Sequence, residues 1–192
     1  MGKKEEIPSL EGYTLEKKTV SILLANILAI VLFLVYGGIC FGAYIMLWSS
    51  NFQMNSNIVL LAIAFIVGLV VHELIHGITW LLLTRTKFSH LSFGFMTGAV
   101  YCHYDMPMRK SHYVIGALTP LLFLGLLPTV VALCVGSLWW LIFGIIFTVS
   151  AIGDIMIVWV IRKEPFTAMV YDHPSEAGCY VYHKNEDTPK TT

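Results

Sequence analysis

The chain has 192 residues, of which 57% are hydrophobic and only 12% are charged. Ordinary soluble domains carry roughly 25% charged residues, so this composition excludes a typical soluble globular protein and favours one that is surrounded mostly by lipid. The 12 basic and 12 acidic side chains cancel, so net charge gives no reason to expect nucleic-acid binding.

Four long apolar blocks follow one another along the chain. A helix needs about 20 residues to cross the hydrocarbon core of a bilayer, and each block reaches that length. The predicted helices span about 20–48, 58–84, 112–135 and 138–162. The first block is too long for a signal-peptide core and is predicted to remain as a helix. We therefore expect an all-α polytopic membrane protein, with residues 1–192 as one membrane domain and 163–192 as its C-terminal tail.

The connections between these blocks differ in their basic residues. Lys and Arg occur before the first block, between the second and third, and directly after the fourth, whereas the other two connections have none. The positive-inside rule then places both termini and the middle loop in the cytoplasm.

The four cysteines form no CxxC pair, which argues against a disulfide framework.

The middle loop and the tail differ in character. Residues 88–104 read FSHLSFGFMTGAVYCHY, in which aromatic and β-branched residues predict two short strands joined near Met96–Gly98. The fold class therefore includes a short cytoplasmic hairpin-like loop between the second and third helices. The tail is polar, and its Asp172-His173-Pro174 turn is expected to be exposed to solvent.

The second apolar block contains the sequence His72-Glu73-Leu74-Ile75-His76. Histidines four residues apart lie on one face of a helix, one turn above each other, where both can bind one zinc ion. Glu73 then lies beside the metal and can act as a general base. Histidines in helices more often serve packing or a local hydrogen bond. Here, however, three polar groups interrupt an apolar run, and a charged side chain at the bilayer centre costs about 2.5–3.5 kcal/mol, so a metal is the favoured partner.

A third ligand is expected at the same depth in the membrane, because a catalytic zinc usually has three protein ligands. Asp154 is the single ionisable residue of the fourth block. Counting 1.5 Å per residue back from Arg85 and Arg162 places both His76 and Asp154 roughly 12–14 Å from the cytoplasmic helix ends. Asp154 could instead be a structural or proton-relay carboxylate. Four other side chains remain as rival third ligands: His103, His112, His173 and Glu176.

An HELIH segment in a transmembrane helix, a glycine-bearing strand-like loop and a later Gly153-Asp154 resemble the site-2 protease group of intramembrane zinc metalloproteases. In that group a later helix supplies an aspartate as third ligand. The chain is also similar to a family of small bacterial membrane proteins described as zincin peptidases. The matching pieces are His72–Gly77, residues 99–104, residues 118–121, Gly153-Asp154 and residues 172–174. The resemblance implies an integral protein of the bacterial plasma membrane.

These features together predict an intramembrane zinc metalloprotease. One Zn²⁺ per chain is held by His72, His76 and Asp154, and Glu73 is the general base for a zinc-activated water. The expected partners are the lipid bilayer and a membrane protein or peptide substrate. An unwound substrate segment could add to the hairpin as a strand, with Leu91, Phe93, Phe95, Ala99 and Tyr101 as its binding residues.

Three alternatives stay open at this stage. The hairpin could be a structural element that packs over the helix ends. The protein could be a zinc-binding membrane scaffold without catalytic activity, because Glu73 is needed for hydrolysis but not for holding the metal. A small ion-coupled transporter using Glu73 and Asp154 is less favoured, since the chain has no internal repeat.

Overall fold

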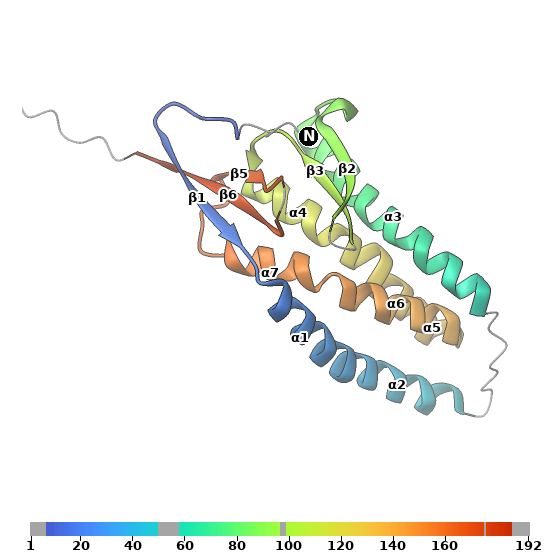
Figure 1. Cartoon of the computed structure of the whole chain (residues 1–192). Helices are drawn as coiled ribbons and strands as arrows, with labels where there is room; N and C mark the ends of the chain where they lie inside the picture. Colours follow the sequence, from blue (N-terminus) through green and yellow to red (C-terminus); the bar gives the residue numbers. More distant parts are fainter. Residues whose placement is uncertain (1–6, 50–57, 97–98, 175, 186–192) are drawn as a thin grey trace, which may run out of the picture.

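The computed structural model describes residues 7–49, 58–96, 99–174 and 176–185, without the side chains of residues 96 and 99. Long helices run side by side through most of the molecule, and two small sheets lie towards one end (Figure 1). In chain order the helical segments are α1 (Ile22–Leu32), η1 (Phe33–Gly37), α2 (Gly38–Trp48), α3 (Ile58–Thr84), α4 (Lys110–Pro120), η4 (Leu121–Leu126), α5 (Leu127–Val135), α6 (Leu138–Ser150) and α7 (Ile152–Val160).

These segments join into four long helices among the described residues, spanning 22–48, 58–84, 110–135 and 138–160. Each is long and apolar enough to cross a membrane, which confirms the four predicted apolar helices. The third begins at Lys110, two residues before its predicted start, and the fourth ends two residues early at Val160.

Three of the long helices are locally distorted. The first contains the π-helical segment η1, between α1 and α2. Pro120 ends α4 and is followed by the π-helical segment η4, because proline has no N–H to continue the regular hydrogen-bond ladder. The fourth helix breaks at Ala151, whose ψ of 6° separates α6 from α7. Asp154 therefore lies in the first turn of a new helix.

The first sheet is the predicted hairpin. A 3₁₀ turn, η3 (Phe88–His90), leads into β2 (Leu91–Met96), which pairs antiparallel with β3 (Ala99–Tyr104). The register places Leu91 opposite Tyr104 and Phe93 opposite Cys102. Residues 97 and 98, in the predicted turn, lie outside the described residues. In Figure 1 the hairpin lies beside α3, as its contacts with that helix require.

The second sheet corrects the all-α expectation. Its four antiparallel strands have the order β1-β6-β5-β4. They are β1 (Tyr13–Thr19), β4 (Met108–Arg109), β5 (Met169–Asp172) and β6 (Gly178–Lys184). The sequence pattern predicts none of them, because two lie in a tail taken as a polar extension and each finds its partner far away in the chain. The sheet joins the segment before the first long helix to the segment after the fourth.

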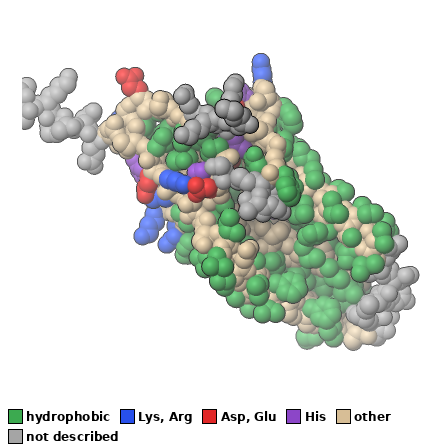
Figure 2. Space-filling view, in the orientation of Figure 1, with side chains coloured by type: hydrophobic (Ala, Val, Ile, Leu, Met, Phe, Trp, Pro, Cys, Tyr) green, Lys and Arg blue, Asp and Glu red, His purple; other side chains and the backbone are tan. Residues whose placement is uncertain are grey.

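Charged and apolar side chains occupy different parts of the surface. Figure 2 shows acidic and basic side chains over the sheet end and a largely hydrophobic surface over the helices.

At the opposite end, aromatic side chains form hydrogen bonds between the helices. The Tyr44 hydroxyl donates to the Gly136 carbonyl at 2.8 Å, and the Trp48 indole N–H donates to Leu133 O at 3.0 Å. Such aromatic anchors are typical of a membrane interface.

Candidate metal centre

Helix α3 carries two buried imidazoles on one face. His72 and His76 are 7% and 5% exposed, and their ring centroids are 4.8 Å apart. The spacing of four residues causes this, because it places successive side chains one above the other on a helix. Glu73 lies beside them and is partly buried. One ligand atom from each of the three residues lies within 4.8 Å of the other two, so the sequence motif forms a compact set of metal donors.

The Asp154 carboxylate faces both imidazoles. His72 Nε2 is 3.2 Å from Asp154 Oδ2, and His76 Nε2 is 3.4 Å from Asp154 Oδ1. The break at Ala151 lets α7 present this carboxylate from its first turn. The structure thus brings together His72 and His76, predicted as ligands from their helical spacing, and Asp154, predicted from its membrane depth.

The outer nitrogens of the two imidazoles have different surroundings. His76 Nδ1 lies 2.9 Å from the Gly116 carbonyl oxygen. That carbonyl is available because its regular helical donor would be the N–H of residue 120, and Pro120 has none. The helix distortion therefore supplies a partner that orients His76, one of the candidate metal ligands. His72 Nδ1 is buried and has no hydrogen-bond partner among the described residues.

Aromatic rings flank the two histidines. His76 stacks on Trp80 with centroids 5.6 Å apart, and His72 stacks on Phe147 at 6.4 Å. Gly68 makes room for Phe147, since a Cβ at residue 68 would lie 2.3 Å from its ring. Packing therefore restricts both imidazoles to one orientation.

The hairpin supplies a hydrogen bond to the candidate base. The Cys102 backbone N–H donates to Glu73 Oε2 at 2.8 Å and so holds the carboxylate towards β3. Burial raises the pKa of the Cys102 thiol to about 12, and the negative charges of Glu73 and Asp172 add to the rise. At neutral pH this side chain is therefore an uncharged thiol.

Three of the four residues considered as rival third ligands have partners outside the metal centre. His103 Nδ1 is 3.1 Å from Asp172 Oδ2, His173 Nε2 is 3.1 Å from the Tyr180 hydroxyl, and Glu176 pairs with Lys17 at 2.6 Å. His112 lies in the first turns of α4. Asp172 and His173 are each only 8% exposed, so the expectation of a solvated turn at 172–174 is wrong for these two side chains. Asp172 is buried against His103 and Tyr113, and His173 lies against Tyr180, whereas Glu176 of the same connection is exposed.

The predicted substrate-binding residues all lie on the hairpin, in two kinds of position. Leu91 packs against α3, where it limits the space at Gly77, and Tyr101 covers Gly94. Phe93 and Phe95 are 41% and 74% exposed. The side chain of Ala99 lies outside the described part of the chain, although its backbone belongs to β3. Within the described residues β2 pairs with β3 alone, which leaves its outer edge without a neighbouring strand.

Comparison with known proteins places the chain in a family. A family model described as "Putative zincin peptidase" matches residues 65–169, more than half of the chain, and the matched region contains His72, His76 and Asp154. The chain belongs to this zincin peptidase family. No curated protein and no solved structure matches it.

A zincin family suggests zinc, and the donor geometry fits that ion. Two ligand atoms of a tetrahedral zinc, each roughly 2.0–2.1 Å from the metal, are about 3.4 Å apart. The two imidazole–carboxylate distances, 3.2 and 3.4 Å, are close to that separation. Two imidazoles and one carboxylate are also a donor set found in catalytic zinc sites. The residues present therefore fit the metal that the zincin family suggests.

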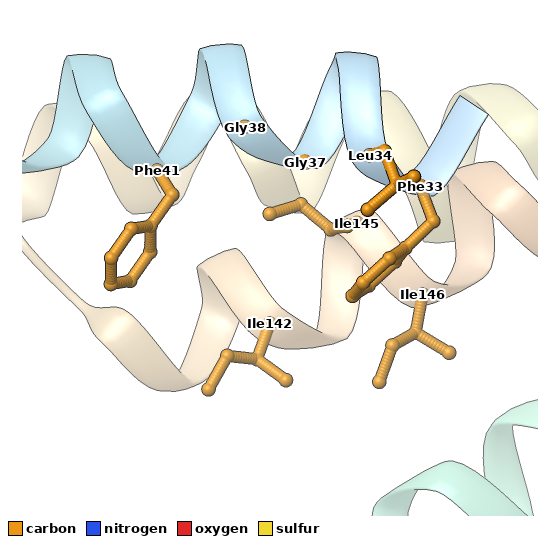
Figure 3. Close-up of a pocket in the computed structure, with 8 residues that line it drawn as sticks. All are labelled: Phe33, Leu34, Gly37, Gly38, Phe41, Ile142, Ile145 and Ile146. Carbon is orange, nitrogen blue, oxygen red and sulfur yellow. The ribbon is translucent and has the colours of Figure 1, made fainter. Parts of the chain in front are cut away.

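Two further features of the described residues, an apolar cleft and a polar cluster, offer no comparable centre. An apolar cleft of about 410 Å³ lies between the first and fourth long helices, with Phe33, Phe41, Ile142 and Ile146 on its walls (Figure 3). No ionisable side chain lines it.

A second cluster of potential metal donors consists of Glu16, Glu164 and His183. Lys18 already occupies the position of a cation there, with its Nζ 2.5 Å from Glu16 and 3.9 Å from Glu164. This cluster is therefore an ion-pair network on the surface of the sheet.

Proposed function

We propose that the chain is an intramembrane zinc metalloprotease that hydrolyses peptide bonds in or near the membrane. The observation that carries this proposal is the convergence of His72 Nε2 and His76 Nε2 on the Asp154 carboxylate, with Glu73 beside them. His72, His76 and Asp154 would hold one zinc ion. When bound, zinc supplies a Lewis acid that polarises a peptide carbonyl and makes water a better nucleophile.

Glu73 is the general base in this proposal. Its carboxylate takes a proton from the attacking water and later donates that proton to the leaving amine. The Cys102 N–H binds Oε2 and so limits rotation of the carboxylate. Gly116 and Trp80 orient His76 through a hydrogen bond and a stacked ring, so this imidazole does not have to reorganise during the reaction.

The substrate is a membrane protein or peptide whose helix must unwind before its peptide bonds become accessible. The outer edge of β2 can pair with such an extended segment, and the exposed Phe93 and Phe95 would contact its side chains. The packing of Leu91 against Gly77 supports the other role as well, in which the hairpin covers the helix. Proline substitutions along 91–96 distinguish the two roles, because strand addition requires free backbone N–H groups on that edge.

The direct test separates metal binding from turnover. Glu73→Gln should retain one zinc per chain in elemental analysis and lower cleavage by about 10²–10⁴-fold, since it removes only the base. Asp154→Ala should lower zinc affinity by about a hundredfold or more. Glu176→Gln is the matched control, because its carboxylate pairs with Lys17 on the surface. Fragments are counted by comparing membrane proteomes of cells that express each variant.

Two outcomes decide between the candidate functions. Fragments that appear with wild type and disappear with Glu73→Gln support the protease. Zinc binding without any Glu73-dependent fragment supports the membrane scaffold instead. Unchanged zinc content in Asp154→Ala would remove Asp154 from the metal centre.

A further inference from the structure

A second group of buried polar side chains lies outside the metal centre, between β3, β5 and α4. His103, Tyr113 and Asp172 are 2%, 2% and 8% exposed. The Asp172 carboxylate faces both of the others: Oδ2 is 3.1 Å from His103 Nδ1, and Oδ1 accepts the Tyr113 hydroxyl at 3.1 Å. One carboxylate from the C-terminal tail thus joins the hairpin, the third long helix and the four-stranded sheet.

The hairpin connects this group to Glu73. His103 directly follows Cys102 in β3, and the Cys102 N–H is the donor to Glu73 Oε2 at 2.8 Å. Neighbouring side chains of a strand point to opposite faces, so His103 can bind Asp172 while its neighbour lies against α3. The hydrogen bond between His103 and Asp172 therefore fixes the position of the peptide group that holds the candidate base.

A stack of rings connects the same group to His76. Tyr113 stacks on Trp80 with centroids 5.5 Å apart and planes 11° apart, and Trp80 stacks on His76 at 5.6 Å and 18°. The Trp80 indole N–H also donates to the Tyr113 carbonyl oxygen at 3.3 Å. The hydroxyl of Tyr113 binds Asp172, so the far end of the stack is fixed by the same carboxylate.

We propose that Asp172, together with His103 and Tyr113, positions the peptidase site from outside it. Asp172 holds Glu73 through His103 and the Cys102 N–H, and it holds His76 through Tyr113 and Trp80. This inference rests on the function proposed above. No contact joins Asp172 to His72, His76, Glu73 or Asp154 among the described residues, so it is a positioning residue and not a catalytic one.

Asp172 can position these groups because its buried carboxylate is held between two side chains, His103 and Tyr113. Removing the charge leaves His103 and Tyr113 with a weaker or missing acceptor in a buried place, where an unpaired polar group is unfavourable. Both donors can then seek other partners, and β3 is free to shift relative to α3. A shift of about 1 Å at a catalytic group can lower a rate by a hundredfold.

The test uses Asp172→Asn, which keeps the size of the side chain, and Tyr113→Phe, which keeps the stacked ring and loses the hydroxyl. Glu176→Gln is the control, because it removes an exposed carboxylate from the same β5–β6 connection. Hydrogen exchange of the amides in 99–104 is measured on the full-length, zinc-free protein. We expect about tenfold faster exchange in Asp172→Asn, a smaller increase in Tyr113→Phe and none in the control.

The zinc-loaded variants give a second readout. Asp172→Asn should keep its zinc and its KM for a cleaved peptide within about twofold, while kcat falls about 10–100-fold, since positioning affects the transition state more than substrate binding. Asp172→Glu, which restores the charge, should recover part of kcat. A purely structural role would instead lower zinc content, protein yield and kcat together.

Hydrogen exchange tests the positioning role of Asp172, and cleavage tests the protease function, so the two proposals can fail independently. Wild-type exchange in 99–104 of both Asp172→Asn and Tyr113→Phe overturns the positioning role, whatever the activity. Faster exchange with no cleavage by any form, wild type included, supports the positioning of Glu73 and counts against the protease function alone. If Asp172→Asn does not fold, the exchange of Tyr113→Phe decides the question.

Discussion

At the scale of single residues, the candidate metal centre includes contacts with backbone groups that a side-chain motif does not reveal. The membrane-depth comparison predicts that His76 and Asp154 meet, and the structure places them 3.4 Å apart. The Cys102 N–H and the Gly116 carbonyl, by contrast, leave no trace in the side-chain pattern, because every residue has such groups. The signal that could reveal the carbonyl is Pro120, whose missing N–H marks residue 116 as an acceptor without a helical donor.

Pro120→Ala tests this link between helix distortion and metal binding. The alanine supplies an N–H that competes with His76 Nδ1 for the Gly116 carbonyl. Because proline is the least favourable residue in a helix interior, the substitution should leave stability unchanged or raise it. We expect zinc affinity to fall about 10–100-fold, as for the loss of other partners of metal-binding histidines.

Zinc titration and thermal unfolding of the same detergent-solubilised samples give both quantities. Pro128→Ala is the matched control, since Pro128 lies in the first turn of α5, where a proline is regular, and touches none of the metal donors in the described contacts. Equal zinc affinities for Pro120→Ala and wild type would contradict the assigned role of Pro120.

At the scale of elements, hydrophobic blocks predict the four long helices and the hairpin well, because apolar length and β-branched or aromatic runs are local signals. In the four-stranded sheet, β5 and β6 carry Val and Tyr residues but lie in a tail interpreted as a polar extension, and the other two strands have no such signal. Strand β1 reads YTLEKKT and is mostly exposed, β4 has two residues, and each finds its partner through long-range pairing. Only the assembled molecule shows that the tail is part of the fold.

Lys110 links this sheet end to the fourth long helix. It is 2% exposed, and its Nζ donates to the carbonyl oxygens of Arg162 and Glu164 at 3.1 and 2.5 Å. A cation is favourable there because carbonyl groups at a helix C-terminus lack helical donors. Lys110→Met should lower the free energy of unfolding by about 1–3 kcal/mol, since it leaves two part-buried carbonyl groups without this donor.

The control for this change is Lys163→Met, which removes an exposed lysine from the same end of the molecule. Denaturant unfolding in mild detergent, followed by Trp fluorescence, compares the two. An effect of Lys163→Met as large as that of Lys110→Met would show that loss of positive charge, and not loss of the carbonyl contacts, causes the destabilisation.

At the scale of the whole molecule, the polar sheets and the connections rich in Lys and Arg lie at one end. The positive-inside rule applied to this distribution predicts that the sheet end faces the cytoplasm. A metal centre near that end would then receive water and substrate from the cytoplasmic side. The distribution of charge is a sequence property, so this part of the organisation can be predicted without coordinates.

Cysteine labelling in intact cells tests the orientation. In a Cys134→Ser background, Ser49→Cys marks the end of α2, and Lys87→Cys marks the connection before the hairpin; both positions are exposed. A membrane-impermeant maleimide should label Ser49→Cys in intact cells and Lys87→Cys only after the membrane is broken. The reverse pattern would place the sheets and the metal centre on the outer side.

The pairing of β1 with β6 has a consequence for how the protein is made. Lys17 of β1 forms an ion pair with Glu176, which lies just before β6, and the two residues are 159 positions apart in the chain. A ribosome adding about 5–20 residues per second needs roughly 10–30 s to synthesise that interval. During this time the first three long helices can enter the bilayer while β1 still waits for its neighbour. Asp172 also emerges late, so under the proposed positioning role the candidate metal centre acquires the contacts of Asp172 with His103 and Tyr113 only after its own residues have been made.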